Sequence, residues 1–363
     1  MSASDSRRRV RVLLVEDSPV MRELLAHVLN ADPGIQVIGA ARNGEEAIEA
    51  VGQMKPDVIT MDFHMPKMNG LDATRKIMET HPTPIVIVSG SSARNEVAAS
   101  FRVMEAGALA VVEKPAGPGH PDHEAAVREL VQTVKLMSEV KVVRRWPRRE
   151  TGVPSAPSRP AADLAPIRAE VKLVAIGAST GGPIALKTIL SGLPKDFAVP
   201  ILIVQHIATG FTQGFVEWLA QSSGVAIHVA THGEYLLPGH GYVAPDGFHM
   251  KLEPSGRIAL SSDRPENGHR PSVSCLFRSV AGVLGRNAIG VLLTGMGKDG
   301  AEELKLMKEG GAVTIAQDQE SSIVHGMPGE AISLDAATYV LAPDRIAEAL
   351  GSLVKRTAGT GDA

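Results

Sequence analysis

Short apolar runs alternate with amphipathic segments along the first third of the chain. The segment "SPVMRELLAHVLNADP" has a capping serine, a proline at the first helical position and leucines and valines on one helical face. Five strand-and-helix repeats of this kind predict a flavodoxin-like domain with strand order 2-1-3-4-5. The apolar runs end at Val15, near Val37, at Met61, at Val88 and at Val112.

The second half repeats the alternation with different lengths. Helices are expected over "PIALKTILSGL", "TQGFVEWLAQSS" and "EELKLMKEGG", and "KLEPSGRIALSS" is typical of a hairpin turning at Ser255 and Gly256. The pattern predicts a second doubly wound, mainly parallel α/β domain with an antiparallel insertion. Its strands are expected in "KLVAIGAS", "VPILIVQHI", "AIHVA", "AIGVLLTGM" and "AVTIAQD".

The segment 142–169 separates these halves and has few apolar residues and five prolines. Its basic cluster around Trp146 could contact nucleic acid, although a solvated helix end is the favoured interpretation. We therefore expect four parts: a first domain, an interdomain helix with a Pro/Arg-rich linker, a second domain and a flexible tail. Their expected bounds are 1–125, 126–169, 170–355 and 356–363.

Composition and charge argue against a nucleic-acid-binding, a disulfide-bonded and a membrane-spanning protein. The 363 residues carry a formal net charge of −3, which suggests neither nucleic acid nor an anionic membrane as a partner. The single cysteine, Cys275, excludes an internal disulfide and suits a reducing compartment. No apolar run reaches the roughly 18 residues of a membrane-spanning helix, and the N-terminal run is too short for a signal peptide. We expect a cytoplasmic protein without membrane insertion.

Three carboxylates follow strands that should be neighbours in the first sheet. Glu16 and Asp17 end the first strand and Asp62 ends the third, so the three should converge at one sheet edge. Such a cluster repels itself unless a hard divalent cation such as Mg²⁺ lies among the oxygens. Ser89 ends the fourth strand and Lys114 follows the fifth. The set is suited to accepting a phosphoryl group on Asp62.

The stretch "VAIGASTGGP" contains "GASTG", which fits the G-x-S-x-G pattern between a strand and a helix. The small neighbours let the backbone turn sharply and expose Ser179, and the helix start offers N–H groups to an oxyanion. A dinucleotide-binding loop is disfavoured, because Ser179 stands where a glycine should approach the pyrophosphate. The following strand also ends in Gln205 and His206 rather than an acid.

A serine nucleophile needs a base and an orienting acid. His206 ends a strand that we expect beside the strand of Ser179, and Asp299 follows another strand in "LLTGMGKDGAEEL". His325 is an alternative base, because Ser179, Asp299 and His325 follow the chain order of α/β-hydrolases. Spacing alone favours His206 only modestly. His249 and His269 are weaker candidates.

The motifs of the first domain, "LLVEDS", "ITMDFHMPKMNGLDA", "VIVSG" and "VVEKP", resemble the response-regulator receiver family. The resemblance implies phosphorylation of Asp62, with Glu16, Asp17 and Asp62 as Mg²⁺ ligands. It also implies that Ser89 and Lys114 contact the phosphate. One departure is Val111, which stands where receivers usually carry an aromatic residue.

The motifs of the second domain resemble the catalytic domain of the chemotaxis protein-glutamate methylesterase (CheB) family. They are "AIGASTGGP", "IVQHI", "HRPSV", "LLTGMGKDGA" and "AQDQESSIVHGMPGEA". The resemblance implies a serine carboxylesterase with Ser179 as nucleophile, His206 as base and Asp299 as orienting acid. Backbone N–H groups of Met296 and Thr180 would serve as oxyanion donors. His325 stands where relatives tend to have an aromatic residue, and Ser274 where an aspartate is common.

The implied reaction is demethylation of glutamate γ-methyl esters with release of methanol, and the same machinery could deamidate glutamine. The implied partners are methyl-accepting chemoreceptors as substrate and a histidine kinase as phosphodonor, with phosphorylation opening a covered cleft. No cofactor is expected for the ester chemistry. Two other classes remain: a receiver-controlled DNA-binding protein, and a general esterase that uses His325.

Overall fold

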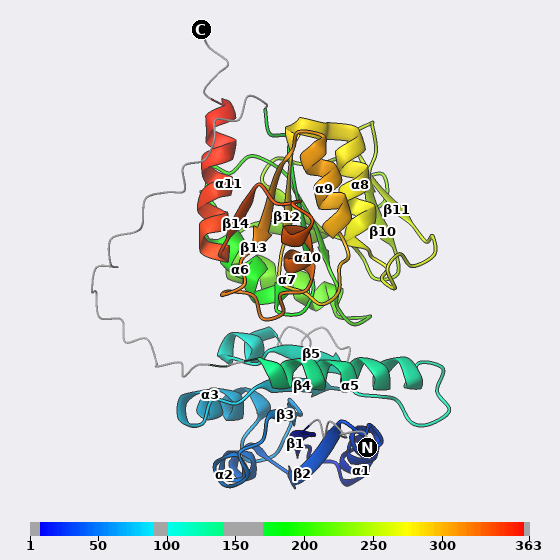
Figure 1. Ribbon diagram of the computed structural model, residues 1–363, viewed down its shortest axis with the longest axis vertical. Coiled ribbons are helices and arrows are strands. Elements are labelled where there is room, and N and C mark those ends of the chain that lie inside the picture. Colours follow the sequence, from blue (N-terminus) through cyan, green and yellow to red (C-terminus); the bar gives the residue numbers. More distant parts are fainter. Residues whose placement is uncertain (1–7, 91–100, 141, 143–169, 359–363) are drawn as a thin grey trace, which may run out of the picture. The chain divides into compact units, whose positions relative to one another are not determined.

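The computed structural model describes residues 8–90, 101–140, 142 and 170–358. The chain forms two compact units that divide between Thr151 and Gly152, and each is described by itself (Figure 1). The arginine-rich segment around Trp146 lies outside the described residues. In the described ranges, no helix combines the length and the apolar character needed to cross a membrane.

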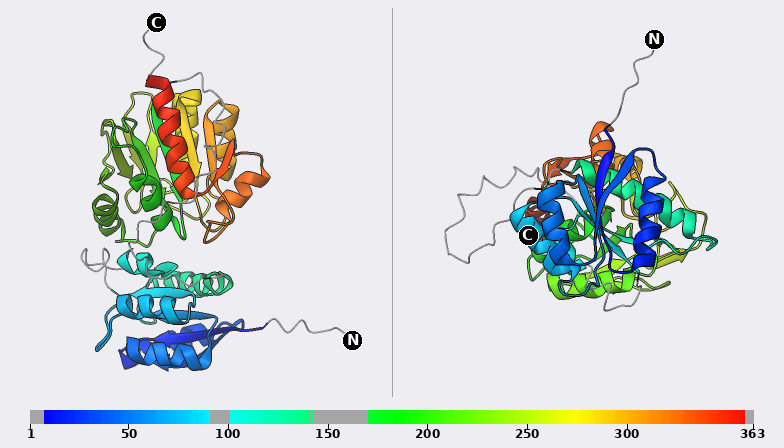
Figure 2. Two further views of the ribbon diagram at one scale, coloured as in Figure 1. Left: turned by 90° about the vertical axis from the view of Figure 1, so that its left-hand side faces the viewer. Right: turned by 90° about the horizontal axis from the view of Figure 1, so that it is seen from below.

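The first unit is built on a five-stranded parallel sheet in the order β2-β1-β3-β4-β5. This is the strand order that the sequence predicts. Each central strand is apolar on both faces because helices cover the sheet on both sides (Figure 2, right). The strands are β1 (Val10–Val15), β2 (Ile35–Ala41), β3 (Val58–Met61), β4 (Ile85–Ser89) and β5 (Ala110–Glu113).

The helices of this unit begin at side-chain caps. The Ser18 hydroxyl accepts a hydrogen bond from the Met21 N–H, and Pro19 is the first helical residue, as predicted. Asn43 and Asn69 cap the next two helices in the same way. Such caps fix the residue at which each helix starts and therefore the length of the loop between strand and helix. The helices are α1 (Pro19–Asn30), α2 (Gly44–Met54), α3 (Gly70–Thr80) and α5 (His123–Glu139).

Helix α5 belongs to the first unit rather than to a connection between domains. It begins at His123, before the expected boundary at 125, and it packs against β3, β4 and β5. Leu130, Val134 and Met137 are fully buried on its inner face. Lys135 also pairs with Asp32 at 2.6 Å. The apolar side of α5 therefore covers part of the sheet. Its position next to the linker in the sequence does not indicate this contact.

The second unit has a seven-stranded parallel sheet in the order β14-β13-β12-β6-β7-β9-β8. The five strands expected from the sequence are present, and β9 and β14 are additional. Both strands are short and lie toward the edges of the sheet. So few residues show no clear alternation of apolar and polar positions from which to predict a strand. The strands are β6 (Leu173–Ala178), β7 (Ile201–Gln205), β8 (Ala226–Val229), β9 (His240–Val243), β12 (Ala288–Leu292), β13 (Val313–Gln317) and β14 (Tyr339–Leu341).

Strands β10 (His249–Leu252) and β11 (Ile258–Ser261) form the predicted antiparallel hairpin. Gly256 has a φ of 78°, a left-handed conformation that glycine adopts without strain. The hairpin packs against helix α8 (Val273–Leu284), which the sequence pattern did not predict. Helix α8 also contacts β6 and β12, two of the strands that end at the candidate site.

The other helices of the second unit cover its seven-stranded sheet (Figure 1). Helix α6 packs against both α7 and α11, while α8 packs against α9. Helix α11 continues to Ala358, three residues into the segment expected as a flexible tail. These helices are α6 (Gly182–Ser191), α7 (Thr212–Ser223), α9 (Ala301–Glu309), α10 (Met327–Ser333) and α11 (Pro343–Ala358).

Candidate active site

Ser179 lies at the carboxyl end of β6, the strand flanked by β12 and β7. Its N–H donates to the Thr294 carbonyl at 3.0 Å, and its carbonyl accepts from the Gly182 N–H at 2.8 Å. Gly181 takes a φ of 81° in this turn, a value that disfavours any side chain. The glycines thus let the chain turn directly from strand into α6. Ser179 stays partly exposed at the turn.

A second glycine leaves room for the serine from the neighbouring loop. A Cβ on Gly295 would lie 2.7 Å from the Ser179 Cβ, closer than side-chain atoms can approach. Gly295 follows β12, the strand next to β6. The close packing of the two loops therefore depends on a glycine in "LLTGMG", the segment that follows a predicted strand.

His206 lies beside Ser179 at the same sheet edge. In the parallel register of β6 and β7, Ala178 pairs with Gln205, so the next residues are Ser179 and His206. The His206 N–H donates to the Ala178 carbonyl at 2.9 Å and fixes the histidine backbone there. No hydrogen bond joins the side chains of these two described residues. The structure thus brings the predicted nucleophile and base together as neighbours.

The imidazole of His206 pairs with the predicted orienting acid. Its Nε2 lies 2.9 Å from Asp299 Oδ2, and both side chains are nearly buried. Because a carboxylate only accepts, Nε2 carries the proton of this hydrogen bond. Nδ1 is buried without a hydrogen-bond partner. It is therefore the ring nitrogen left to take a proton from a neighbouring group.

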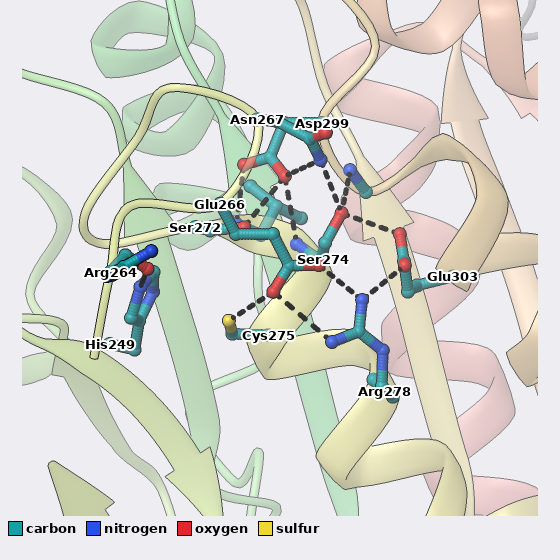
Figure 3. Close-up of polar contacts among 12 residues, drawn as sticks. His249, Arg264, Glu266, Asn267, Ser272, Ser274, Cys275, Arg278, Asp299 and Glu303 are labelled. Carbon is teal, nitrogen blue, oxygen red and sulfur yellow. Dashed lines mark hydrogen bonds and ion pairs between the residues drawn. The ribbon is translucent and has the colours of Figure 1, made fainter. Parts of the chain in front are cut away.

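Asp299 accepts hydrogen bonds from five donors. Figure 3 draws those around it other than His206. Besides His206, these include the backbone N–H groups of Val273 and Ser274 at the start of α8. Burial by itself would raise the pKa of this carboxyl, but the His206 pairing and the other donors hold the pKa well below its usual range. The remaining donors are Asn267 Nδ2 at 3.1 Å and Ser272 Oγ at 2.8 Å.

Sequence reasoning did not single out Asn267 or Ser272. Ser272 has the position of an N-cap of α8, yet its hydroxyl donates to Asp299 and makes no cap hydrogen bond. A serine before the apolar run "VSCLF" is a sequence signal for the start of a helix. Nothing in the sequence indicates that this serine contacts Asp299, which lies 27 residues further along the chain. The amino end of α8 and its flanking side chains therefore hold the acid.

The ring of His269 stacks on the ring of His206, with centroids 3.9 Å apart and planes 7° from parallel. His269 was one of the weaker base candidates, and the structure places it against the stronger one. Burial and then the charge of His206 lower the pKa of His269 to about 4. At neutral pH the stacked ring is therefore uncharged and does not repel a protonated His206.

The free energy of unfolding should depend on pH through the partly buried His269 ring. Unfolded His269 takes up a proton near its ordinary pKa, while the folded residue resists protonation until about pH 4. The unfolded state then binds more protons in this window, so the free energy of unfolding should fall as pH drops from about 6.5 to 4. His269→Gln should remove roughly 1–3 kcal/mol of that fall, measured by urea unfolding at several pH values. The exposed His232→Gln is the control, and an unchanged slope in His269→Gln would contradict the assignment.

His325 is placed differently from His206. It forms an isolated parallel bridge with Gly295 and precedes α10. Its Nδ1 lies 3.4 Å from Ser322 Oγ, and no ion pair joins it to a carboxylate among the described residues. Burial lowers its pKa. His249 is fully buried, with Nε2 3.1 Å from the Arg264 carbonyl. Of these histidines, His206 is the one held by an acid.

The two predicted oxyanion donors lie in the loops that border Ser179. Thr180 directly follows the serine, and its carbonyl accepts from Thr294 Oγ1 at 2.9 Å. Met296 lies in the loop between β12 and α9, one residue after the glycine that contacts Ser179. Their backbone N–H roles stay predictions.

The first unit carries a separate polar site, where the predicted carboxylates come together. Oxygen atoms of Glu16, Asp17 and Asp62 lie within 4.8 Å of one another. Lys114 Nζ lies 2.8 Å from Glu16 Oε2 and 3.0 Å from Asp62 Oδ2. Three carboxylates around one point form the hard oxygen donor set that Mg²⁺ prefers. Ser89 ends β4 as predicted and is buried.

Charge and burial compete within this cluster. Burial, reinforced by the nearby charge of Asp62, raises the pKa of Glu16 against the opposing effect of Lys114. The pKa of Lys114 is raised overall, because contacts with Glu16 and Asp62 outweigh its burial. The Lys114 ammonium thus balances two buried acids, Glu16 after β1 and Asp62 after β3.

Comparison with known proteins gives the same division of the chain. The family described as CheB methylesterase matches residues 174–350, and the response regulator receiver domain matches residues 12–126. A protein-glutamate methylesterase/protein-glutamine glutaminase of Geobacter metallireducens is 59% identical over 95% of this chain and 99% of its own. One of Nitrosospira multiformis is also 59% identical, over 95% of this chain and 97% of its own. The crystal structure of the Thermotoga maritima CheB methylesterase catalytic domain is 39% identical with a TM-score of 0.50, covering 51% of this chain and all of that one.

Proposed function

Because this chain belongs to the CheB family of protein-glutamate methylesterases/protein-glutamine glutaminases, we propose that it hydrolyses glutamate γ-methyl esters on the cytoplasmic helices of methyl-accepting chemoreceptors. The reaction releases methanol and restores the glutamate. The receiver domain at the amino end makes the hydrolase a target of a chemotaxis histidine kinase.

The proposal is carried by one observation, the pairing of His206 with Asp299 beside Ser179. The pair leaves Nδ1 as the buried ring nitrogen without a partner. A histidine held in one tautomer by a carboxylate can take a proton from a serine hydroxyl and return it later. Neither a binding protein nor a structural domain requires this arrangement at the carboxyl ends of neighbouring strands.

The reaction divides into two halves. Ser179 Oγ attacks the γ-carbonyl carbon of the methyl ester while His206 takes the hydroxyl proton. The tetrahedral intermediate collapses, the bond to the methoxy oxygen breaks, and His206 protonates that oxygen to give methanol. Water then attacks the acyl-enzyme, giving one proton to His206, and the released glutamate leaves Ser179 with its proton restored.

Backbone N–H groups should stabilise the negative oxygen of each tetrahedral intermediate. We assign this task to Thr180, at the turn into α6, and to Met296, in the loop after β12. Donors on two separate loops around one carbonyl are the usual arrangement of an oxyanion hole. A glutamine side chain presents the same carbonyl with ammonia as leaving group, so the site should also deamidate glutamine.

The control step uses the carboxylate cluster of the first unit. Glu16, Asp17 and Asp62 would hold Mg²⁺, which neutralises charge on a phosphoryl group passing to the Asp62 carboxylate. Lys114 and Ser89 would contact the phosphate. Phosphorylation then shifts the population toward a form with an accessible catalytic site.

The direct test measures methanol release from membranes that contain methylated chemoreceptors. The purified protein should release methanol and leave unmethylated glutamates, detected by mass spectrometry of receptor peptides. Release of ammonia from receptors with glutamine at these positions tests the second activity. Failure of both reactions, with a protein that reacts with other esters, would favour a general esterase instead.

Phosphorylation should raise this activity through Asp62. Acetyl phosphate with Mg²⁺ should increase methanol release by the intact protein several-fold and leave Asp62→Ala at its basal rate, because that variant has no phosphoryl acceptor. Removal of Mg²⁺ with EDTA should abolish the increase. Asp72→Ala, which removes an exposed carboxylate of the same unit, is the control. Equal rates with and without phosphodonor would rule out this form of control.

A further inference from the structure

Asp299 is held by a polar cluster that extends beyond the five groups touching its carboxylate (Figure 3). We propose that Ser274 and Glu303 are positioning residues of the hydrolase, which fix the loop of Asp299 through a chain of hydrogen bonds centred on the buried Ser274. The inference rests on the proposed function, since it assigns a role in the same reaction. Neither residue touches Ser179 or His206.

The Ser274 hydroxyl uses its complete hydrogen-bonding capacity. It donates to Glu303 Oε2 at 2.6 Å, and it accepts from the Gly300 N–H at 3.0 Å and from Asn267 Nδ2 at 3.2 Å. A hydroxyl has one proton and two lone pairs, so each is engaged. Ser274 is 1% exposed, which leaves no water to replace a lost partner.

These contacts hold the loop between β12 and α9 at two successive residues, Asp299 and Gly300. The Ser274 N–H donates to Asp299 Oδ1 at 3.2 Å, while the Ser274 hydroxyl accepts from the next residue, Gly300. Asn267 Nδ2 joins the same two groups, since it donates to both Asp299 Oδ1 and Ser274 Oγ. One serine therefore links the first turn of α8 to the loop that enters α9.

Glu303 determines which way the Ser274 hydroxyl points. Its carboxylate can only accept, so the hydroxyl proton turns toward it and both lone pairs remain for Gly300 and Asn267. Arg278 Nη2 lies 2.7 Å from Glu303 Oε1 and also pairs with Glu266. The guanidinium holds the carboxylate in place and balances its charge, and the Glu303 side chain is only 14% exposed.

Replacing Glu303 by glutamine should change the direction in which the Ser274 hydroxyl donates, while the side chain at 303 keeps its size. If the amide oxygen stays on Arg278, the amide N–H₂ faces the Ser274 hydroxyl and competes for a lone pair. The hydroxyl proton must then turn toward Gly300 or Asn267, both of which are donors. One of the contacts that hold the Asp299 loop is lost, and the Asp299–His206 pair loosens.

The test compares Glu303→Gln with Glu302→Gln, which removes an exposed carboxylate from the same helical turn. Glu303→Gln should lower kcat for methanol release about 10–100-fold, the usual effect of one charge-assisted hydrogen bond, with KM nearly unchanged. Glu302→Gln should match the wild type. Ser274→Ala should behave like Glu303→Gln, and Ser274→Thr should recover part of the loss because it keeps the hydroxyl.

A second readout follows the Asp299–His206 pair directly. The proton between Nε2 and Oδ2 should give a downfield NMR resonance, assigned by its absence in His206→Gln, that shifts or broadens in Glu303→Gln and not in Glu302→Gln. Thermal unfolding shows whether each variant is folded. Unchanged kcat and an unchanged resonance in folded Glu303→Gln would overturn the inference.

Failure of the proposed function has a different signature. The rate at which a fluorophosphonate labels Ser179 reports the reactivity of the serine without a receptor substrate. If the wild type is labelled but releases no methanol, the substrate assignment fails, and labelling rates of the same variants still test the positioning role. If the wild type releases methanol and Glu303→Gln matches it, the positioning role alone fails.

Discussion

Replacing Ser179 by alanine should lower methanol release by about 10⁴-fold or more while the protein stays folded. The reason is that the substitution removes only the hydroxyl oxygen at the end of β6 and leaves the backbone contacts to Thr294 and Gly182 in place. Without that oxygen no acyl-enzyme forms, and only water activated by His206 could attack the ester. The measurement is methanol release from methylated receptors under phosphodonor, with thermal unfolding as the check of folding.

Two histidine variants serve as a matched comparison for Ser179→Ala. His206→Ala should be nearly as damaging, because it removes the group that carries the proton in both halves of the reaction. His325→Ala should keep most of the activity, since no acid orients that ring among the described residues. Retained turnover in Ser179→Ala would point to another nucleophile. An inactive His325→Ala with an active His206→Ala would favour the general esterase.

Converting Asp299 to asparagine should lower kcat by about 10⁴-fold, although the side chain keeps its size. All five partners of the carboxylate are donors, and an amide nitrogen cannot accept from any of them. Three of the five donors, Asn267, Ser272 and the Ser274 N–H, lie on Oδ1, so the amide oxygen that remains would favour that position. His206 would then face an N–H₂ group and turn its unprotonated Nε2 toward it. Nδ1 would carry the proton and could no longer act as a base.

Asp263→Asn provides the control for this substitution. Asp263 is an exposed aspartate that pairs with Lys251 and Ser261, so the same chemical change there should leave kcat unaltered. Asp299→Asn should also unfold at a lower temperature, because buried donors lose their acceptor. Activity of Asp299→Asn within a few-fold of the wild type would mean that His206 does not depend on the carboxylate for its tautomer.

The sequence by itself determined the main elements of both sheets. Runs such as "LLVED" and "KLVAIGAS" are short, apolar and followed by helical periodicity, which is sufficient to predict parallel strands between helices. In such sheets, residues after successive strands meet at one edge. For this reason Glu16, Asp17 and Asp62 could be grouped in advance, and so could Ser179, His206 and Asp299.

Only the tertiary structure decided how the groups at that edge are joined. Spacing alone left both His206 and His325 as candidate bases, and the structure adds that Asp299 contacts Nε2 of His206 and that Nδ1 has no hydrogen-bond partner. The contacts of Asn267, Ser272 and Ser274 with Asp299 join residues 25 to 32 positions apart. His269, from the loop between β11 and α8, stacks on His206 at the end of β7. Periodicity reports which side of an element is buried. It holds no information on which donor faces which acceptor across two loops, because that depends on how α8 packs against the sheet.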